Sequence, residues 1–370
     1  MVEWKKLGGI ANLVRGKVIS KDYIRDHEGL YPVYSSQTAN DGILGSIDSY
    51  MFDGDFLTWT TDGAYAGTIF RRKGKFNITN VCGLVDLTDK QVNQDFLYYW
   101  LSFVAKDYVN EGMGNPKLMS NVASTIRIPV PSLSEQTRVV GILDTFTASI
   151  ENLKQQIAQR RKQYEHYRDQ LLDLEGKEGV EMKTLGEVCD KTGNIKWKNE
   201  TDDACYRYID LSSVSIESHI IGSASIIKKS NAPSRAQQVV KEGDVLLGTT
   251  RPTLKRFCLV TQEFDNQICS TGFCVFRANR VEVNEKWIYH NIGCNRFWDY
   301  CELKQQGAGY PCLSNTDAFL YYIPVPSLPE QQRIVSILDT FEASIANLEQ
   351  QLAQRERQYE YYRNKLLTFE

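Results

Sequence analysis

Two stretches of the chain place apolar residues alternately three and four positions apart. The first series runs from Leu143 through Phe146 to Leu174, and the second runs from Leu338 to Phe369. This is the a/d spacing of a heptad repeat sustained over more than four heptads, and it is typical of a coiled-coil helix. We therefore predict two long helices of about 40 residues, each roughly 60 Å long at 1.5 Å per residue.

Both helical stretches belong to an internal repeat. Residues 128–175 align with residues 323–370 at a constant offset of 195 (323 − 128), and 33 of the 48 paired positions are identical. Repeated segments in one chain favour a pseudo-two-fold arrangement like that of identical subunits. We expect the two helices to pair with each other as an antiparallel intramolecular coiled coil. Two separate dimerisation helices are the alternative.

The segments that precede the repeats show a different pattern. Short β-branched and aromatic runs, broken by Gly, Asn and Asp, predict strands and hairpins. One amphipathic helix is expected over residues 94–109, and its counterpart near Glu285 to Cys301. The fold class is therefore α+β, with two pseudo-symmetric domains of mixed helix and strand separated by the two long helices. The expected domains are residues 1–130 and 179–325, and the expected helical regions are residues 131–178 and 326–370.

Composition excludes several classes of protein. The chain has 370 residues with 43 basic and 46 acidic side chains, a formal charge of −3, and 42% apolar residues, which indicates a globular protein. No uncharged apolar run approaches the ~18 residues of a membrane helix, and the start of the chain has no apolar signal region, so we expect no membrane association and a cytoplasmic location.

Nine cysteines occur without a C-x-x-C pair, and only four histidines accompany them. This spacing favours free thiols and predicts no metal site.

Sequence signatures of catalysis are missing. We find no P-loop, no Gly-x-Ser-x-Gly elbow, and no Asn-Pro-Pro-aromatic element that would hold a flipped adenine. The Gly-x-Gly-x-Pro loops at Gly112 and Gly307 lack the strand-before, helix-after context of a phosphate-binding loop. The domains are therefore predicted to recognise a partner and not to be enzymes.

Local clusters of basic and short polar side chains favour DNA as that partner. Lys and Arg at loop tips neutralise phosphates, and Arg, Asn and Gln contact base edges in the major groove. Each residue taken alone is equally consistent with a solvated face or a turn, so the prediction rests on the clusters together. The predicted DNA-binding residues are Ser35, Ser36, Gln37, Asn40, Thr60, Thr61, Arg71, Arg72, Lys73, Lys75, Lys117, Lys228, Lys229, Arg235, Arg251, Lys255 and Arg256.

The order of the segments resembles a known family. Two unlike domains alternate with two near-identical helical regions, each opened by Ile-Pro-Val-Pro-Ser-Leu-x-Glu-Gln-x-Arg at Ile128 and Ile323. The Gly-x-Gly-x-Pro-x-Leu loop before this element, and Tyr31-Pro-Val-Tyr-Ser-Ser in the first domain, also match. Over essentially its whole length the chain resembles the specificity subunit of a type I restriction-modification system.

The resemblance implies a non-catalytic, sequence-specific DNA-binding subunit. Each domain would be a target recognition domain for one half of a bipartite, asymmetric site on double-stranded DNA, and the paired helices would set the spacing between the halves. Two modification (methylase) subunits and the restriction (translocase and nuclease) subunits would be its partners. S-adenosylmethionine, ATP and Mg would be used by those partners, with no cofactor bound by this chain. The alternative is a coiled-coil protein-interaction scaffold without DNA recognition.

The repeated helix starts are our candidates for docking the methylase subunits. Because the element occurs twice, two copies of one partner could bind two similar surfaces. A role limited to capping the helix start is equally consistent with these residues. The predicted partner-binding residues are Glu135, Gln136, Arg138, Glu330, Gln331 and Arg333.

Overall fold

The computed structural model describes residues 2–112 and 114–369. Met1 and Glu370, which end the outer predicted regions, and Met113 of the first Gly-x-Gly-x-Pro loop lie outside the described residues. Within the described residues, no helix combines the length and the apolar character needed to cross a membrane.

The chain forms two compact units. The first contains Met1–Lys154 and Gln351–Glu370, and the second contains Gln155–Gln350. The division falls inside the two long helices, α5 (Leu133–Leu171) and α10 (Leu328–Leu366), so each unit contains part of both. The predicted α+β class and the two long helices of 39 residues each are confirmed.

A six-stranded sheet forms the centre of the first unit. Its strand order is β2-β7-β5-β6-β3-β4, and β3 and β6 run parallel while the other neighbours run antiparallel. The strands are β2 (Ala11–Arg15), β3 (Glu28–Tyr34), β4 (Ile43–Ile47), β5 (Phe52–Thr60), β6 (Ile69–Ile78) and β7 (Cys82–Leu87). The short helices are α1 (Leu7–Ile10), α2 (Lys21–Asp26), α3 (Gln94–Val104) and α4 (Ser120–Ala123), with 3-10 turns at Ala39–Gly42 and Ala105–Tyr108.

The second unit is built on two four-stranded sheets. Their strand orders are β10-β17-β14-β15 and β12-β11-β16-β13. The strands are β10 (Cys189–Asp190), β11 (Tyr206–Ile209), β12 (Ser225–Ile227), β13 (Ala236–Val239), β14 (Val245–Gly248), β15 (Phe257–Leu259), β16 (Ile268–Ser270) and β17 (Phe273–Ala278). The helices are α6 (Leu185–Val188), α7 (Glu285–Gly293), α8 (Asn295–Lys304) and α9 (Asn315–Phe319), with 3-10 turns at Trp197–Asn199, Leu211–Ser213, Pro252–Leu254 and Gln262–Phe264.

In each domain a two-stranded antiparallel ribbon lies just before the N-terminus of the long helix that follows the domain. β1 (Glu3–Lys6) pairs with β8 (Arg127–Val130), and β9 (Glu181–Thr184) pairs with β18 (Tyr322–Val325). The Ile-Pro-Val residues of the repeated element therefore belong to a strand. Each long helix begins two residues later than the predicted helical region, at Leu133 and Leu328. The ribbon ties the first residues of each domain to its last.

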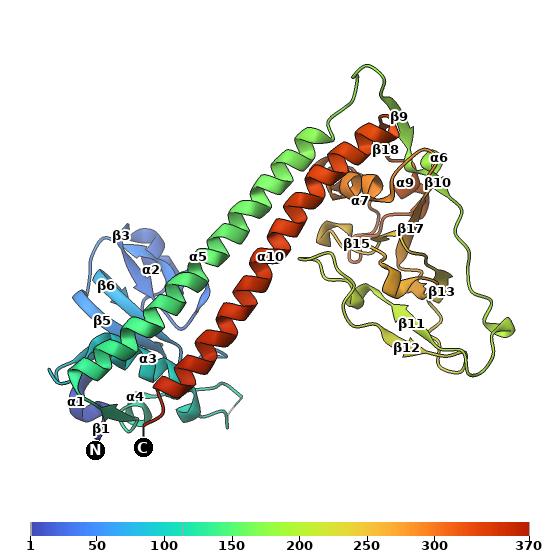
Figure 1. Cartoon of the computed structure of the whole chain (residues 1–370). Coiled ribbons are helices and arrows are strands. Elements are labelled where there is room, and N and C mark those ends of the chain that lie inside the picture. Colours follow the sequence, from blue (N-terminus) through green and yellow to red (C-terminus); the bar gives the residue numbers. More distant parts are fainter. Residues whose placement is uncertain (1, 113, 370) are drawn as a thin grey trace. The chain divides into compact units, whose positions relative to one another are not determined.

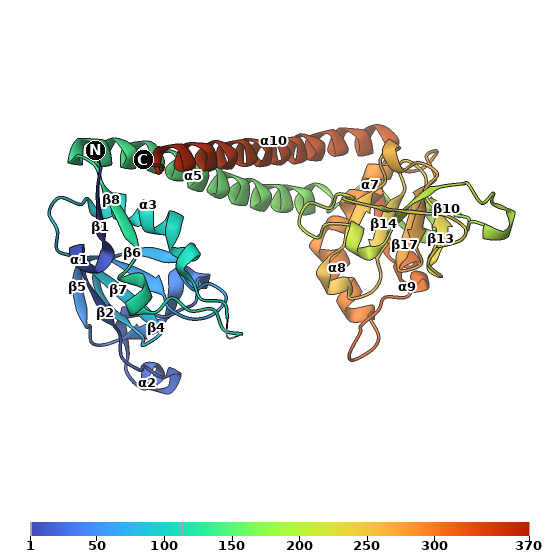
Figure 2. The ribbon, with the colours of Figure 1, turned by 90° about the horizontal axis from the view of Figure 1, so that it is seen from below.

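The two long helices are antiparallel and contact each other in both units. In the first unit Phe146 of α5 stacks on Tyr362 of α10, and in the second Tyr167 stacks on Phe341. α5 (green) and α10 (red) lie side by side in both views (Figures 1 and 2). The predicted antiparallel intramolecular pairing is confirmed.

One helix prediction is wrong in detail. The expected helix near Glu285 to Cys301 is two helices, because Cys294 adopts an extended ψ of 148° between α7 and α8. The preceding Gly293 packs so closely that a Cβ there would lie 3.3 Å from a guanidinium nitrogen of Arg168. The break thus lets the end of α7 approach α5.

Each domain core is closed by helix segments from both repeats. In the first unit Val139 and Leu143 of α5 and Leu367, just beyond α10, are buried among strand and α3 residues. In the second unit Leu338 of α10 and Leu172, just beyond α5, are buried in the equivalent way. All nine cysteines lie in the described part of the chain and are free thiols.

Candidate nucleic-acid interface

The predicted docking residue Gln136 is fully buried at the start of α5. Its side-chain oxygen accepts a hydrogen bond from the backbone N–H of Asn93 at 2.7 Å. Its amide nitrogen donates to the backbone carbonyls of Gln91 and Pro131, both at 2.8 Å. Gln136 therefore fixes the N-terminus of α3 to the helix start, and its interpretation as a partner contact is corrected.

Gln331 repeats this arrangement in the second unit. It too is fully buried, accepts from the N–H of Asn284 at 3.0 Å, and donates to the carbonyls of Glu282 and Pro326 at 3.0 and 2.9 Å. Asn93 and Asn284 are the N-caps of α3 and α7, so each glutamine positions the cap of a domain helix. The docking interpretation of Gln331 is corrected for the same reason.

The remaining predicted docking residues stay at the surface. Arg138 makes two hydrogen bonds to Glu135, at 2.8 and 2.6 Å, and Arg333 makes the same pair of bonds to Glu330, at 2.8 and 2.7 Å. In each pair the guanidinium lowers the pKa of the glutamate. These two charged pairs occupy equivalent positions of the repeat. In each pair the arginine is exposed and the glutamate is partly exposed.

An aspartate of the repeated Ile-Leu-Asp element anchors each domain helix. In the first unit Asp144 accepts a hydrogen bond from the Tyr99 hydroxyl at 2.6 Å and lies 3.3 Å from Arg71. Arg71 also pairs with Asp95 at 2.8 Å. Arg71, predicted to bind DNA, is therefore held against α3 and α5 by two carboxylates.

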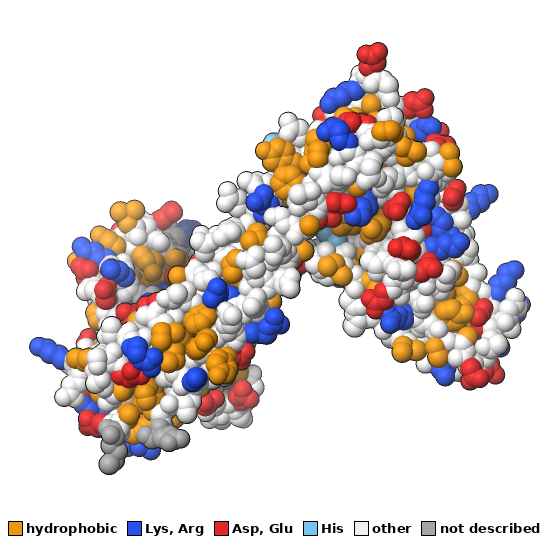
Figure 3. Space-filling view, viewed as in Figure 1, with side chains coloured by type: hydrophobic (Ala, Val, Ile, Leu, Met, Phe, Trp, Pro, Cys, Tyr) orange, Lys and Arg blue, Asp and Glu red, His pale blue; other side chains and the backbone are white. Residues whose placement is uncertain are grey.

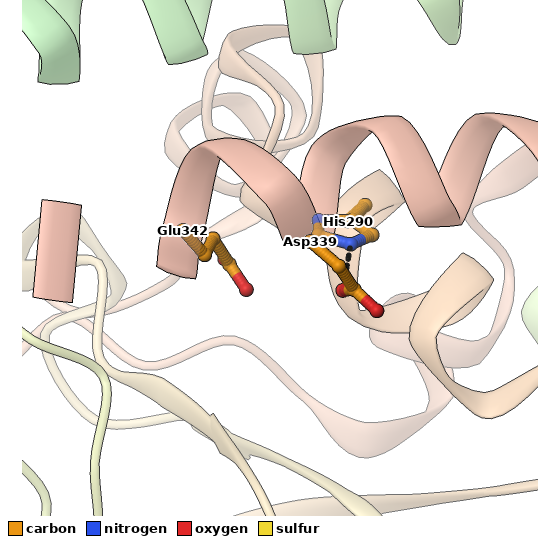
Figure 4. A group of neighbouring side chains, drawn as sticks. All are labelled: His290, Asp339 and Glu342. Carbon is orange, nitrogen blue, oxygen red and sulfur yellow. Dashed lines mark ion pairs between the residues drawn. The ribbon is translucent and has the colours of Figure 1, made fainter. Parts of the chain in front are cut away.

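Asp339, the repeat equivalent of Asp144, anchors α7 to α10 in the second unit (Figure 4). It accepts from Lys286 at 2.7 Å, and its second oxygen lies 3.5 Å from Nε2 of the fully buried His290. Burial raises the pKa of Asp339, but the neighbouring His290 and Lys286 outweigh this effect and lower the pKa overall. Figure 4 shows Asp339 directed at His290, with Glu342 three residues further along the same helix.

His290, Asp339 and Glu342 place one nitrogen and two carboxylate oxygens within 4.8 Å of one another. Their other contacts are with the protein: Tyr164 donates to Glu342 at 2.9 Å and lies 3.1 Å from Nδ1 of His290. Since each carboxylate accepts from a neighbouring side chain, we interpret this group as the attachment of α7 to both long helices.

Several other predicted DNA contacts are buried inside the first domain. Arg72 is 3% exposed; its guanidinium lies 3.6 Å from the ring centre of Tyr34 and bonds Asp41 at 2.7 Å. It lies in the middle of β6 and not at a hairpin tip, because Arg71-Arg-Lys-Gly-Lys75 is strand and its alternate side chains face opposite ways. Ser35, Thr60 and Thr61 are also buried, so none of these four side chains presents a surface to DNA in this structure.

The surface candidates fall in three places. Lys73 and Lys75 project from β6, with Lys75 4.5 Å from the ring centre of Tyr50, and Ser36, Gln37 and Asn40 lie in the segment between β3 and β4. Lys228, Lys229 and Arg235 lie between β12 and β13, where Lys229 pairs with Asp202 at 3.6 Å. Lys117, Arg251, Lys255 and Arg256 lie in the loop pairs described next. Basic and acidic side chains are interspersed over the face in Figure 3, in keeping with the near-neutral charge.

The two domains build equivalent loop pairs. In the first, the loop after β5 meets the Gly-x-Gly-x-Pro loop: Gly63 N–H donates to Pro116 O at 3.0 Å, and Leu118 N–H donates to Thr61 O at 2.9 Å. Lys117 in this pair lies 3.6 Å from Asp62. Tyr65 at the tip is 59% exposed.

The second domain forms two equivalent backbone hydrogen bonds between its own pair of loops. Arg251 N–H donates to Pro311 O at 2.7 Å, and Leu313 N–H donates to Thr249 O at 2.9 Å. Pro116 and Leu118 correspond to Pro311 and Leu313 at the repeat offset of 195. Arg251 therefore occupies the position of Gly63 in the first domain.

Arg251 adopts a conformation that favours glycine. Its φ is +50°, as is that of Lys255 four residues later, whereas the first domain has Gly63 at φ +92°. A left-handed conformation costs a non-glycine residue of order 1 kcal/mol and tends to occur at functional sites. The Arg251 guanidinium lies 4.7 Å from the ring centre of Tyr310, which is 71% exposed.

Among the described residues, Arg251, Lys255 and Arg256 have no ion-pair partner, so their charge is open to an anion.

Sequence reasoning missed the tyrosines of these loops. Tyr65 in Asp62-Gly-Ala-Tyr-Ala-Gly and Tyr310 in Gly309-Tyr-Pro are exposed aromatic side chains in glycine-rich segments. The available signal was a large aromatic residue in a glycine-rich segment with no other large apolar residue beside it. Aromatic rings of this kind can stack on bases or pack against sugars.

Comparison with known proteins settles the family. A model of the type I restriction modification DNA specificity domain matches residues 1–160 and again residues 177–357. The chain belongs to this family. A Mycoplasma pneumoniae protein that carries the name of a type I specificity subunit, S.MpnORF507P, is 29% identical over 98% of this chain and 97% of its own length. The specificity subunit of the type I restriction enzyme MpnII, from the same organism, is 38% identical over 44% of this chain and 51% of its own.

The fold of this specificity-domain chain is also found in a solved structure. The S subunit of a type I restriction-modification system from M. genitalium aligns over 100% of this chain and 97% of its own, with a TM-score of 0.65 and 16% identity. Two copies of the specificity domain on one chain disfavour the alternative of a scaffold without DNA recognition.

Proposed function

We propose that this chain is the DNA-recognition subunit of a type I restriction-modification complex, in which each domain recognises one half of a bipartite, asymmetric sequence. The two family matches on one chain support this proposal. The observation that carries it is the equivalent loop pair with unlike side chains: Gly63 and Tyr65 in one domain, Arg251 and Lys255 in the other. Equivalent loop pairs that carry different side chains suit two different half-sites.

The loop pair of the second domain has the chemistry of a DNA contact. Arginine can bond guanine in the major groove through two hydrogen bonds, and lysine neutralises phosphate. The strained backbone at Arg251 projects its side chain from a loop already fixed to Pro311, so little conformational freedom remains to be lost on binding. In the first domain the cation of the loop pair is Lys117, which lies on the Gly-x-Gly-x-Pro loop, 3.6 Å from Asp62.

The helix starts suit two identical partner subunits. The exposed Glu135–Arg138 and Glu330–Arg333 pairs are repeat equivalents and present the same charge pattern twice. In our proposal two methylase subunits dock there, and restriction subunits join them. Catalysis, with S-adenosylmethionine, ATP and Mg, belongs to those partners, and the complex works on cytoplasmic DNA.

The test is methylation sequencing of cells that express this chain with its cognate modification subunits. We expect methyladenine in a split motif that is absent when the chain is omitted. Arg251→Gln combined with Lys255→Gln should lower methylation of that motif by about tenfold, as expected for loss of one base contact and one phosphate contact. Lys191→Gln, an exposed lysine of the same unit outside the loop pair, is the matched control. A methylation pattern that does not depend on the chain, in an assembled complex, would reject the proposal in favour of a scaffold.

A further inference from the structure

The seam between α5 and α10 is symmetric. The Phe146–Tyr362 stack, with ring centres 5.3 Å apart, becomes the Tyr167–Phe341 stack at 5.5 Å when each residue is exchanged for its repeat equivalent, 195 positions away. The contacts of the two arginines in the seam are also exchanged by the repeat offset of 195. Arg160 lies 6.0 Å from the ring centre of Phe341, and Arg355 lies 5.7 Å from that of Phe146.

Because of this symmetry, the aromatic and cation–π contacts of the seam give no preference for the unlike helix. If α5 paired antiparallel with α5 of a second copy, Phe146 would meet Tyr167 and Arg160 would meet Phe146. Two copies of α10 would likewise bring Phe341 against Tyr362. The aromatic and cation–π contacts of the seam would be reproduced in all three pairings. Apolar packing alone therefore cannot specify that α5 binds α10.

The ion pairs beside the seam are not symmetric. Lys154 of α5 lies 3.5 Å from Glu356 of α10 in the first unit, and Arg161 of α5 lies 2.6 Å from Glu349 of α10 in the second. Lys154 and Glu349 are repeat equivalents (154 + 195 = 349), as are Arg161 and Glu356 (161 + 195 = 356). The two contacts occupy equivalent positions, but both cations are on α5 and both anions on α10.

The sequence of the repeat singles out the same two positions. Among the 48 aligned pairs of the repeat, charge is reversed only at 154/349 and 161/356. In a pairing of two α5 helices Lys154 would face Arg161, and in a pairing of two α10 helices Glu349 would face Glu356. Like charges at such flanking positions disfavour a coiled-coil pairing, whereas opposite charges favour it.

We propose that these two reversals select the pairing partner: they direct α5 to α10 and exclude association of like helices between two copies of the chain. Each ion pair is partly exposed and contributes little alone. Selection arises because two attractions in the correct pairing become two repulsions in either wrong one. The consequence is that the two helices of each chain pair with each other and leave no helix surface for a second copy. This inference concerns the helices alone and stands whether or not the DNA-binding proposal holds.

The test exchanges charges without changing net charge. In the full chain, Lys154→Glu with Glu349→Lys makes each helix complementary to itself and makes the unlike pairing repulsive. We expect this variant to dimerise at least tenfold more tightly than the natural sequence, measured by light scattering after size-exclusion chromatography in low salt. Co-purification of two differently tagged copies should rise with it, and 0.5 M NaCl should reduce the difference because salt screens exposed charges.

Two further variants make the outcome decisive. Arg161→Glu with Glu356→Arg should behave like the first exchange. All four substitutions together should restore the natural behaviour, because both selected positions are then acidic on α5 and basic on α10. Lys162→Glu with Glu165→Lys, on exposed residues of α5 with no ion pair among the described residues, is the control and should change nothing. The proposal is overturned if the exchanges leave dimerisation unchanged, or if the fourfold variant still dimerises like the twofold ones.

Discussion

At the scale of single residues, neighbouring side chains of one strand have opposite roles. Arg71, Arg72 and Lys73 are consecutive in β6, yet the first pairs with α5, the second is buried, and the third is exposed. A basic run in a sequence therefore indicates charge without indicating which charge is free. The strand alternation that separates them is visible only once the strand is assigned.

Arg72 should matter for stability and not for DNA. Arg72→Ala removes a buried side chain from between Tyr34 and Phe70 and should lower the free energy of unfolding of the first unit by about 2–4 kcal/mol. Lys73→Ala, at the exposed neighbour, should change it by no more than about 0.5 kcal/mol. Urea titration followed by tryptophan fluorescence measures both. A weaker DNA affinity for Arg72→Ala with unchanged unfolding would contradict this assignment.

At the scale of elements, the C-terminal end of each long helix packs into a domain core. The end of α5 packs into the second unit, and the end of α10 packs into the first. Leu172 follows α5 and is buried in the second unit, and its repeat equivalent Leu367 follows α10 and is buried in the first. Phe369 continues this contact, with its ring centre 6.0 Å from that of Phe96. The helix ends are therefore structural parts of the domains as well as of the coiled coil.

Truncating either leucine should loosen one unit only. Leu172→Ala and Leu367→Ala each remove a fully buried side chain, at a cost of about 2–4 kcal/mol. Hydrogen exchange measured by mass spectrometry should speed up in β14 and β17 for Leu172→Ala, and in β5 and β7 for Leu367→Ala. Leu133→Ala, at a half-exposed position, is the control. Equal loosening of both units by either substitution would argue against this division of the core.

At the scale of the whole molecule, the sequence predicts the arrangement of domains and helices but not the side-chain contacts within them. The offset of 195 and the heptad seam were sufficient for two domains, two helices and their antiparallel pairing. A polar residue at a helix start is usually exposed, so the sequence predicts Gln136 and Gln331 as partner contacts. Their burial depends on the backbone of Asn93 and Asn284, which no local sequence pattern places there. Arg251 was identified as basic, but its equivalence to Gly63 required the loop hydrogen bonds.

Replacement of a whole domain should act on half of the recognised sequence. Exchange of residues 1–130 for the same region of another family member, with the helices kept, should change one half of the methylated motif and leave the other half intact. Methylation sequencing of the assembled complex gives both halves in one experiment. A change in both halves, or in neither, would contradict independent reading by the two domains.

The nesting of the second unit within the first has a consequence for synthesis. Residues 155–350 form one continuous unit, whereas the first unit needs residues 351–369 for its core. Both units need residues of α10 or just beyond it, which are made after the rest of either domain. The N-terminal domain is made first and therefore waits longest with part of its apolar surface uncovered. The interval before α10 emerges is when the nascent chain is most open to aggregation or to capture by chaperones.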